Sequence, residues 1–241
     1  MEPATYLAAI RRESAAFAAA AGRDLTAPVP SCPGWDVAEL VRHLGRVQHW
    51  VAGGVRAGSR ERFARVAPPP RDEVVPWFEA GAADLVAVLE EAGPDRAVWN
   101  FILEDGRVAT TGWWFRRQAQ EAAMHRWDAE AATGAPPVLE PELAADGVDE
   151  FLHIVLPHAP GIGVELVGSL HLHRTDGEGE WMVRFLPAGM EVSREHGKGD
   201  TAVRGPASGL LLWLSNRTGS DGLEVFGDRQ LVERWPQLVR F

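Results

Sequence analysis

The stretch Gln118-Ala-Gln-Glu-Ala-Ala-Met-His-Arg-Trp-Asp128 has helical character and carries a carboxylate and an imidazole about one helix turn apart. Glu121 and His125 stand four residues apart, so they leave the same helix face about one turn from each other. In that arrangement they can share one metal ion. The rest of this face is partly apolar and should point at a core, where each polar group needs a partner. A buried Glu–His ion pair also meets that need, and the spacing alone favours it.

A third candidate ligand, His43, lies in an earlier segment that is also predicted to be helical. Asp36 followed by Glu39 is typical of a helix N-cap with a carboxylate in the first turn. On the helix that begins there, His43 interrupts an apolar stripe. A lone histidine in such a stripe is more often a core residue than a ligand. Beside Glu121 and His125, however, it supplies a third donor and strengthens the case for a metal site.

Four amphipathic helices are predicted in the first part of the chain. The first covers residues 5–20, the second begins at Asp36, the third covers 75–89, and the fourth begins at Thr110 or Thr111. Four such helices form a bundle. Bundle interiors are places where side chains from facing helices commonly build a metal site.

The sequence pattern changes after Gly134, where a proline-rich stretch is typical of a linker. Beyond it we expect a helix at 142–156, strands at 164–173, 181–186, 201–204 and 223–226, a helix at 207–216, and a last helix capped by Asp228. The predicted fold class is therefore α+β. It comprises a four-helix bundle over residues 1–135 and a smaller α+β domain over residues 136–241.

Composition excludes several classes of function. The chain has 241 residues, a formal net charge of −10 and a pI near 5.3. This acidic balance argues against nucleic acids and anionic membranes as partners, because both need a clustered positive surface. A single cysteine, Cys32, excludes an intramolecular disulfide and a thiolate zinc finger. Since no signal peptide and no apolar run of roughly 20 residues is visible, we expect a cytoplasmic protein.

Two further histidines, His171 and His173, share one face of a predicted strand. Metal sites on sheets also use that spacing. Because no carboxylate adjoins them in the sequence, we expect a solvated strand face.

These motifs together resemble the mycothiol-dependent maleylpyruvate isomerase family, whose N-terminal domain is a metal-binding, DinB-like four-helix bundle. The resemblance rests on three segments: Cys32-Pro-Gly-Trp-Asp36 ahead of the helix bearing His43, Glu121-Ala-Ala-Met-His-Arg-Trp-Asp128, and Arg204-Gly-Pro-Ala-Ser-Gly-Leu-Leu-Leu-Trp-Leu-Ser-Asn-Arg217. It spans nearly the whole chain.

The resemblance implies that His43, Glu121 and His125 bind a divalent metal ion. Two imidazoles and one carboxylate suit zinc, although nickel and iron accept the same set, and three protein ligands leave one position open. The resemblance further implies that this position receives the thiol of mycothiol. Its thiolate would add to an activated cis double bond, allow rotation about the resulting single bond, and leave to give the trans product.

The resemblance also points to an arginine in the C-terminal domain that grips a substrate carboxylate. Arg204 and Arg217 are the candidates, because a guanidinium can bind a carboxylate with two parallel hydrogen bonds. Either could instead be a surface salt-bridge partner. Asp128 could orient the imidazole of His125, or it could be a solvated surface carboxylate.

The expected function is a metal-dependent isomerase that uses mycothiol and acts on a small electrophilic substrate. A mycothiol S-transferase acting on another electrophile is the alternative among enzymes. A non-catalytic, metal-containing ligand-binding protein is the alternative from another class, and a fourth protein ligand closing the site would favour it. The oligomeric state stays open between monomer and homodimer.

Overall fold

In the computed structural model the chain divides into two compact units, Met1–Pro137 and Val138–Phe241. The structure describes every residue except 59–65, 101–108, 135, 160–161, 163–164 and 240–241. The sequence predicts the boundary between residues 135 and 136. Across the described ranges, no helix combines the length and the apolar character needed to cross a bilayer.

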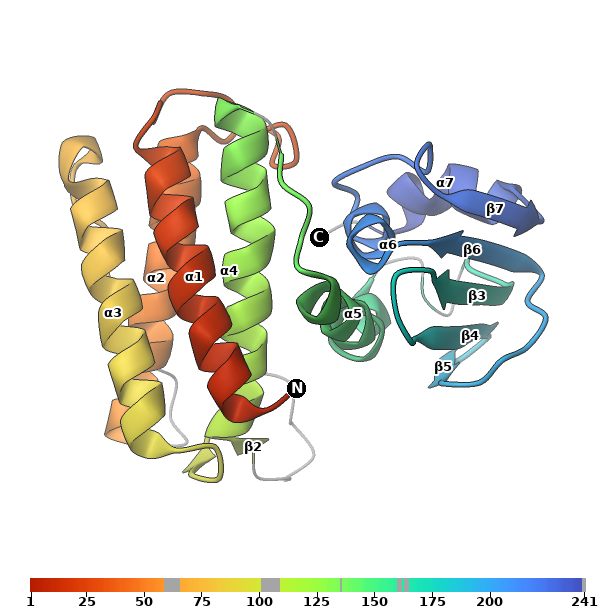
Figure 1. The fold of residues 1–241 in the computed structure, drawn as a ribbon, viewed down its shortest axis with the longest axis horizontal. Helices are drawn as coiled ribbons and strands as arrows, with labels where there is room; N and C mark the ends of the chain where they lie inside the picture. The colour runs from red at the N-terminus through yellow and green to blue at the C-terminus, as the bar shows by residue number, and fades with distance from the viewer. Residues whose placement is uncertain (59–65, 101–108, 135, 160–161, 163–164, 240–241) are drawn as a thin grey trace. The chain divides into compact units, whose positions relative to one another are not determined.

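Four helices make up the first unit: α1 (Pro3–Ala21), α2 (Val37–Ala57), α3 (Val74–Ala92) and α4 (Thr111–Thr133). They lie side by side in Figure 1, and α1 and α2 each pack against both α3 and α4. A 3-10 turn, η1 (Arg71–Glu73), leads into α3. A short antiparallel pair, β1 (Ala97–Val98) and β2 (Ala109–Thr110), precedes α4. The predicted helical bundle is therefore confirmed.

Local chemistry sets the ends of these helices. The side chain of Asp36 accepts a hydrogen bond from the backbone N–H of Glu39, which makes it the predicted N-cap of α2. Thr110 occupies the N-cap position of α4, but its side chain makes no capping hydrogen bond. The hydroxyl of Thr111 instead donates to the carbonyl of Gly93, the C-cap of α3. This bond joins the start of α4 to the end of α3.

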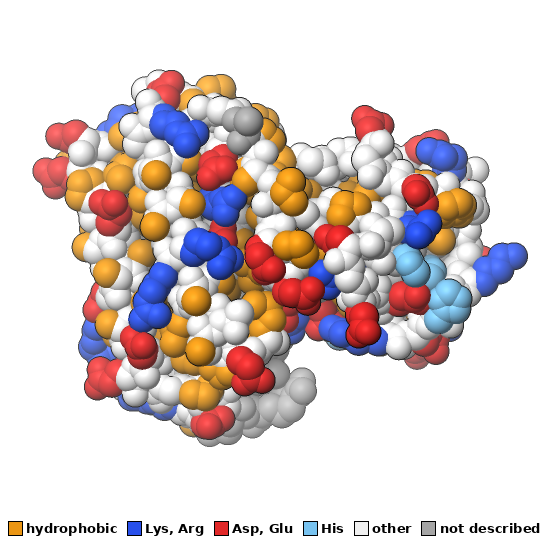
Figure 2. Space-filling view, viewed as in Figure 1, with side chains coloured by type: hydrophobic (Ala, Val, Ile, Leu, Met, Phe, Trp, Pro, Cys, Tyr) orange, Lys and Arg blue, Asp and Glu red, His pale blue; other side chains and the backbone are white. Residues whose placement is uncertain are grey.

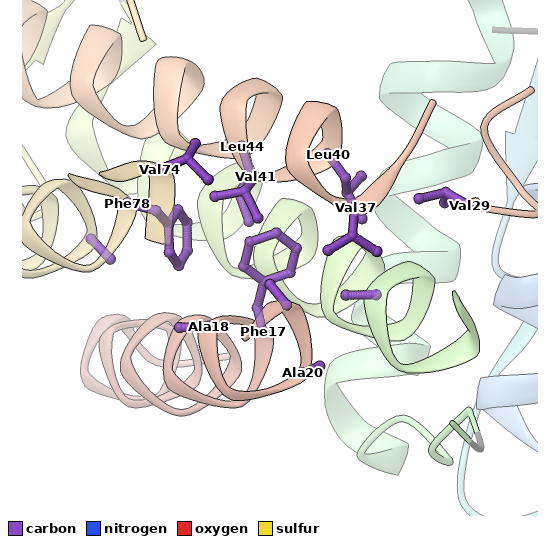
Figure 3. Packing of buried hydrophobic residues seen from close by; sticks show 13 residues of the cluster. Phe17, Ala18, Ala20, Val29, Val37, Leu40, Val41, Leu44, Val74 and Phe78 are labelled. Atoms are coloured by element: carbon purple, nitrogen blue, oxygen red, sulfur yellow. The ribbon is translucent and has the colours of Figure 1, made fainter. Parts of the chain in front are cut away.

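Aromatic and branched aliphatic side chains fill the core of the bundle. Phe17 from α1 and Phe78 from α3 meet edge to face, with ring centroids 4.8 Å apart. Val41 and Leu44 from α2 close the space beside these two rings, as Figure 3 shows. All four side chains are fully buried. An aromatic pair of this geometry contributes about 0.5–1.5 kcal/mol beyond the burial of its area.

A close approach between α2 and α3 depends on Gly45. A methyl group added there would lie 2.3 Å from the Trp77 ring, so Gly45→Ala must displace the indole or the helix. We expect this substitution to destabilise the protein by about 1 kcal/mol, because an overpacking cost of about 1–3 kcal/mol exceeds alanine's helix-propensity gain of about 1 kcal/mol. Urea unfolding of the full chain measures the change.

Gly53 in the same helix provides the matched control. A methyl group at Gly53 would meet nothing within 4 Å. Gly53→Ala should therefore stabilise the protein by about 0.5–1 kcal/mol through helix propensity. If the two variants changed the free energy of unfolding by the same amount, the close-packing argument would be contradicted.

The second unit combines helices with a five-stranded sheet. The helical elements are α5 (Pro141–Glu150), a π turn η2 (Phe151–Val155), a 3-10 turn η3 (Leu156–His158), α6 (Ala207–Leu214) and α7 (Gln230–Leu238). The strands are β3 (Gly168–Arg174), β4 (Glu180–Leu186), β5 (Gly189–Ser193), β6 (Thr201–Gly205) and β7 (Glu224–Gly227). The predicted α+β class is confirmed.

The sheet has the order β5-β4-β3-β6-β7. Strands β3 and β4 form the predicted antiparallel hairpin, in which His173 lies opposite Glu180. Strand β6 runs parallel to β3, so the chain between β5 and β6 must cross from one side of the hairpin to the other. Strand β5 is not among the predicted strands. The predicted start of the first strand, residue 164, lies outside the described residues.

Candidate metal centre

Three side chains from two helices converge inside the bundle. The Nε2 atoms of His43 on α2 and of His125 on α4 each lie 3.3 Å from the same atom, Oε1 of Glu121. Each side chain offers a ligand atom, and these atoms lie within 4.8 Å of one another. The two imidazole rings stand edge to face, with centroids 5.0 Å apart. The structure therefore brings together the three residues singled out in the sequence.

Two of the distances within this donor set match those between the ligands of a zinc ion. Ligand atoms about 2.0–2.1 Å from a tetrahedral zinc ion lie roughly 3.3–3.4 Å from each other. The two nitrogen-to-oxygen distances of 3.3 Å match that value. No fourth histidine, cysteine or carboxylate joins this group among the described residues. The arrangement of donors thus suits an ion with three protein ligands and an open position.

Asp128 lies on the far side of His125 from His43 and Glu121. Its Oδ2 lies 2.9 Å from Nδ1 of His125, and its side chain is 0% exposed. The hydroxyl of Ser31 donates to the other carboxylate oxygen of Asp128 at 2.5 Å. The carboxylate is therefore not solvated on the surface. It holds the ring of His125 so that Nε2 points at Glu121.

The turn before α2 contributes to the site in a way that the sequence did not reveal. Backbone hydrogen bonds from Cys32 N–H to the Val29 carbonyl and from Trp35 N–H to the Cys32 carbonyl fold this segment tightly. The turn brings Ser31 to Asp128, and it places the indole of Trp35 5.1 Å from the ring of His43. The only signal in the sequence was the Pro-Gly turn itself, which does not indicate where the turn packs.

Arg117 and the histidines keep Glu121 ionised. Burial opposes the charge of this carboxylate, but the neighbouring guanidinium of Arg117 and hydrogen bonds with His125 and His43 hold the pKa of Glu121 well below its ordinary value. Burial likewise opposes a charge on His125. Its hydrogen bonds with Asp128 and Glu121 outweigh burial and raise the pKa of His125 to about 9. In the metal-free protein the two groups therefore form a charged pair at neutral pH.

The raised pKa predicts that the metal-free protein loses stability in alkali. A histidine whose pKa rises from 6.5 unfolded to about 9 folded stabilises the fold fully below pH 6.5, and that contribution disappears as the pH rises through about 9. The shift corresponds to a loss on the order of 3 kcal/mol. Urea unfolding of the chelator-treated protein between about pH 6 and pH 9.5 measures it. A His125→Asn variant should lack this loss, and equal pH profiles for the two proteins would refute the assignment.

The two arginines of the predicted substrate clamp both lie in the second unit. Arg204 on β6 pairs with Glu224 on β7 at 3.2 Å, and its side chain is 48% exposed. Arg217 follows α6 and donates to the carbonyl of Ser215 at 3.0 Å. The contacts of Arg204 are those of a surface ion pair. A substrate-binding role for either residue stays a prediction.

Gln118 is a further polar residue on α4, three positions before Glu121. It is buried, and within the described part of the chain neither atom of its amide has a hydrogen-bond partner. A buried amide without partners costs free energy, so it is suited to binding a ligand atom. Helix geometry puts Gln118 on the face of Glu121 and His125, but the sequence gives no sign that its amide would lack a partner among the described residues.

Two family models match this chain. The model of the mycothiol maleylpyruvate isomerase N-terminal domain matches residues 7–130, which hold all three converging side chains, and the model of the MDMPI C-terminal domain matches residues 142–234. The chain belongs to the mycothiol maleylpyruvate isomerase family. The resemblance identified in the sequence is thereby confirmed.

Individual proteins are also similar to this chain. Uncharacterized protein MT0763 and uncharacterized protein Rv0738, from two strains of Mycobacterium tuberculosis, are each 29% identical over 164 residues, which cover 65% of this chain and 83% of theirs. Crystal structures of the mycothiol-dependent maleylpyruvate isomerase and of a His-to-Ala mutant of it share the fold. Their TM-scores are 0.64 and 0.66, at 14% identity and with 93% of each chain covered.

Proposed function

We propose that this chain is a metal-dependent isomerase that uses mycothiol as its thiol cofactor and works in the cytoplasm. The observation that carries the proposal is the convergence of His43, Glu121 and His125 on a common point without a fourth protein ligand among the described residues. Membership of the mycothiol maleylpyruvate isomerase family supports the choice of thiol and of reaction.

Zinc is the ion we propose, held by two imidazole nitrogens and one carboxylate oxygen. When bound, such an ion lowers the pKa of a coordinated thiol and so supplies a thiolate at neutral pH. The chain's own residues prepare the site for this chemistry. Asp128 fixes the ring of His125 with Nε2 facing inward, and Arg117 keeps Glu121 in its anionic form.

The proposed substrate is a small electrophile with a cis double bond activated by a carbonyl group, of which maleylpyruvate is the first candidate. The thiol supplies a nucleophile that can add to such a bond and leave again. We assign the amide of Gln118 to binding a polar atom of the thiol or substrate, because it is buried and unpaired within the described residues. Arg204 and Arg217 remain the proposed partners for substrate carboxylates.

Metal analysis followed by thiol titration tests the proposal. The purified full chain should hold about one zinc ion in the bundle, and replacing zinc by cobalt should make thiol binding visible as a change in the absorption spectrum. Conversion of maleylpyruvate that requires both the metal and mycothiol would support the isomerase. Thiol binding with turnover of other electrophiles only would favour the S-transferase alternative, and metal without a thiol response would favour a binding protein.

A further inference from the structure

A second group of potential metal ligands lies in the C-terminal unit, well away in sequence from the bundle motifs. His171 and His173 on β3 and Glu180 on β4 each offer a ligand atom, and these atoms lie within 4.8 Å of one another. Nε2 of His171 lies 3.2 Å from Oε2 of Glu180, and Nδ1 of His173 lies 3.0 Å from Oε1. Histidine side chains gather on the face of this unit that Figure 2 shows.

The register of the hairpin creates this group. His171 and His173 project from the same face of β3 because they are two residues apart. Glu180 lies directly opposite His173 on β4, so its carboxylate reaches both imidazoles from the neighbouring strand. The expectation of a solvated strand face is therefore wrong. The hairpin turns the chain back so that Glu180, which follows the two histidines in the sequence, meets them from the neighbouring strand, and His171 is only 6% exposed.

The segment that joins β5 to β6 covers His171 and brings a third imidazole. Gly199 in this segment lies so close to β3 that a methyl group there would stand 2.9 Å from the backbone nitrogen of His171. Only a glycine permits that approach. His196, three residues earlier, places Nδ1 2.8 Å from Oε2 of Glu180. The same carboxylate oxygen therefore contacts His171 from the sheet and His196 from the crossing segment.

We propose that His171, His173, Glu180 and His196 form a second metal site, which binds Zn²⁺ or a similar divalent transition-metal ion. Three imidazoles and one carboxylate are the borderline donors that zinc prefers. The ligand atoms of His171, His173 and Glu180 already lie within 4.8 Å of one another, whereas His196 contacts this group through Oε2 of Glu180 at 2.8 Å and would join it by a movement of its exposed side chain.

Four protein ligands distinguish this site from the one in the bundle. A closed coordination shell is typical of a structural zinc ion rather than a catalytic one. Because His196 belongs to the segment between β5 and β6, a bound ion would fasten that segment to the β3–β4 hairpin. The side chain of His196 is 83% exposed, so the segment alone restrains it weakly and a metal ion would order it.

Zinc analysis of the full chain with the first site disabled tests this proposal. His125→Asn removes a ligand from the bundle, and after zinc loading and gel filtration the variant should keep about one zinc ion per chain. Adding His173→Asn should remove that ion. Adding His196→Asn, which alters only an exposed side chain, should weaken zinc binding at least about tenfold, because it deletes one of four ligands.

A matched control and a second readout make the outcome unambiguous. His153 is exposed and pairs with the carboxylate of Asp149, outside both groups of potential ligands, so His153→Asn in the same background should leave zinc content unchanged. Zinc should also raise the unfolding temperature of the His125→Asn protein but not of the His125→Asn, His173→Asn protein. Zinc content that is unaffected by both His173→Asn and His196→Asn would overturn the proposal, as would the absence of zinc from the His125→Asn protein.

Discussion

Replacing His125 with asparagine is expected to eliminate metal binding in the bundle while leaving its helices folded. Nε2 of His125 is one of three converging donors, and an asparagine side chain is too short to replace it at that position. Its amide can still donate to Asp128, as Nδ1 of the imidazole does now. The affinity should fall by more than the roughly 10- to 100-fold that loss of an orienting partner alone costs.

Metal content and circular dichroism together measure this result. The variant should lose the zinc ion assigned to the bundle and the thiol response, yet keep the far-ultraviolet spectrum of the wild type. His153→Asn, an identical substitution at an exposed histidine of the other unit, is the matched control. Glu121→Gln removes a second ligand and should give the same loss. If both variants held as much zinc per chain as the wild type, these residues would not be the ligands of the ion.

Replacing Asp128 with asparagine should lower metal affinity by about 10- to 100-fold although every proposed ligand remains. The carboxylate accepts a hydrogen bond from Nδ1 of His125, so Nε2, which faces Glu121, is the nitrogen that gives up its proton when a metal ion binds. An asparagine can turn its NH₂ group towards Nδ1 instead. The ring would then carry its proton on Nε2, the atom that has to bind the metal.

Competition with a chromophoric chelator measures the affinity of the Asp128→Asn protein. Asp84→Asn makes the same charge change in the same bundle, but Asp84 pairs with Arg56 on the surface and is not among the converging residues, so the substitution should leave the affinity unchanged. Ser31→Ala removes one of the two hydrogen bonds that hold Asp128 and should have a smaller effect than Asp128→Asn. An unaltered affinity in Asp128→Asn would mean that the carboxylate only supports packing.

The parts of the bundle that depend on local chemistry could be predicted from the sequence. The spacing of Glu121 and His125 fixes their common helix face. The Asp36 cap fixes where α2 begins and therefore the face of α2 on which His43 lies. The role of Asp128 could not be settled in this way. Its burial depends on Ser31, which is 97 residues away in the chain and reaches the carboxylate only through tertiary packing.

In the C-terminal unit, too, the sequence predicts local structure but not which side chains meet across the sheet. The hairpin between β3 and β4 follows from alternating apolar residues on either side of a Gly-rich turn. The grouping of His171, His173 and Glu180 depends on the register of that hairpin, and a shift of one residue would move Glu180 to the other face. Strand β5 is short and contains a glycine and a glutamate, so its propensity is weak and pairing with β4 determines it.

The separation of His43 from Glu121, 78 positions along the chain, has a consequence during synthesis. At about 5–20 residues per second, α4 leaves the ribosome roughly 4–16 s after α2. Throughout that interval the nascent chain offers one imidazole of the triad and none of its other donors. Whatever delivers an ion to the bundle must therefore act on a polypeptide whose first four helices have already been translated.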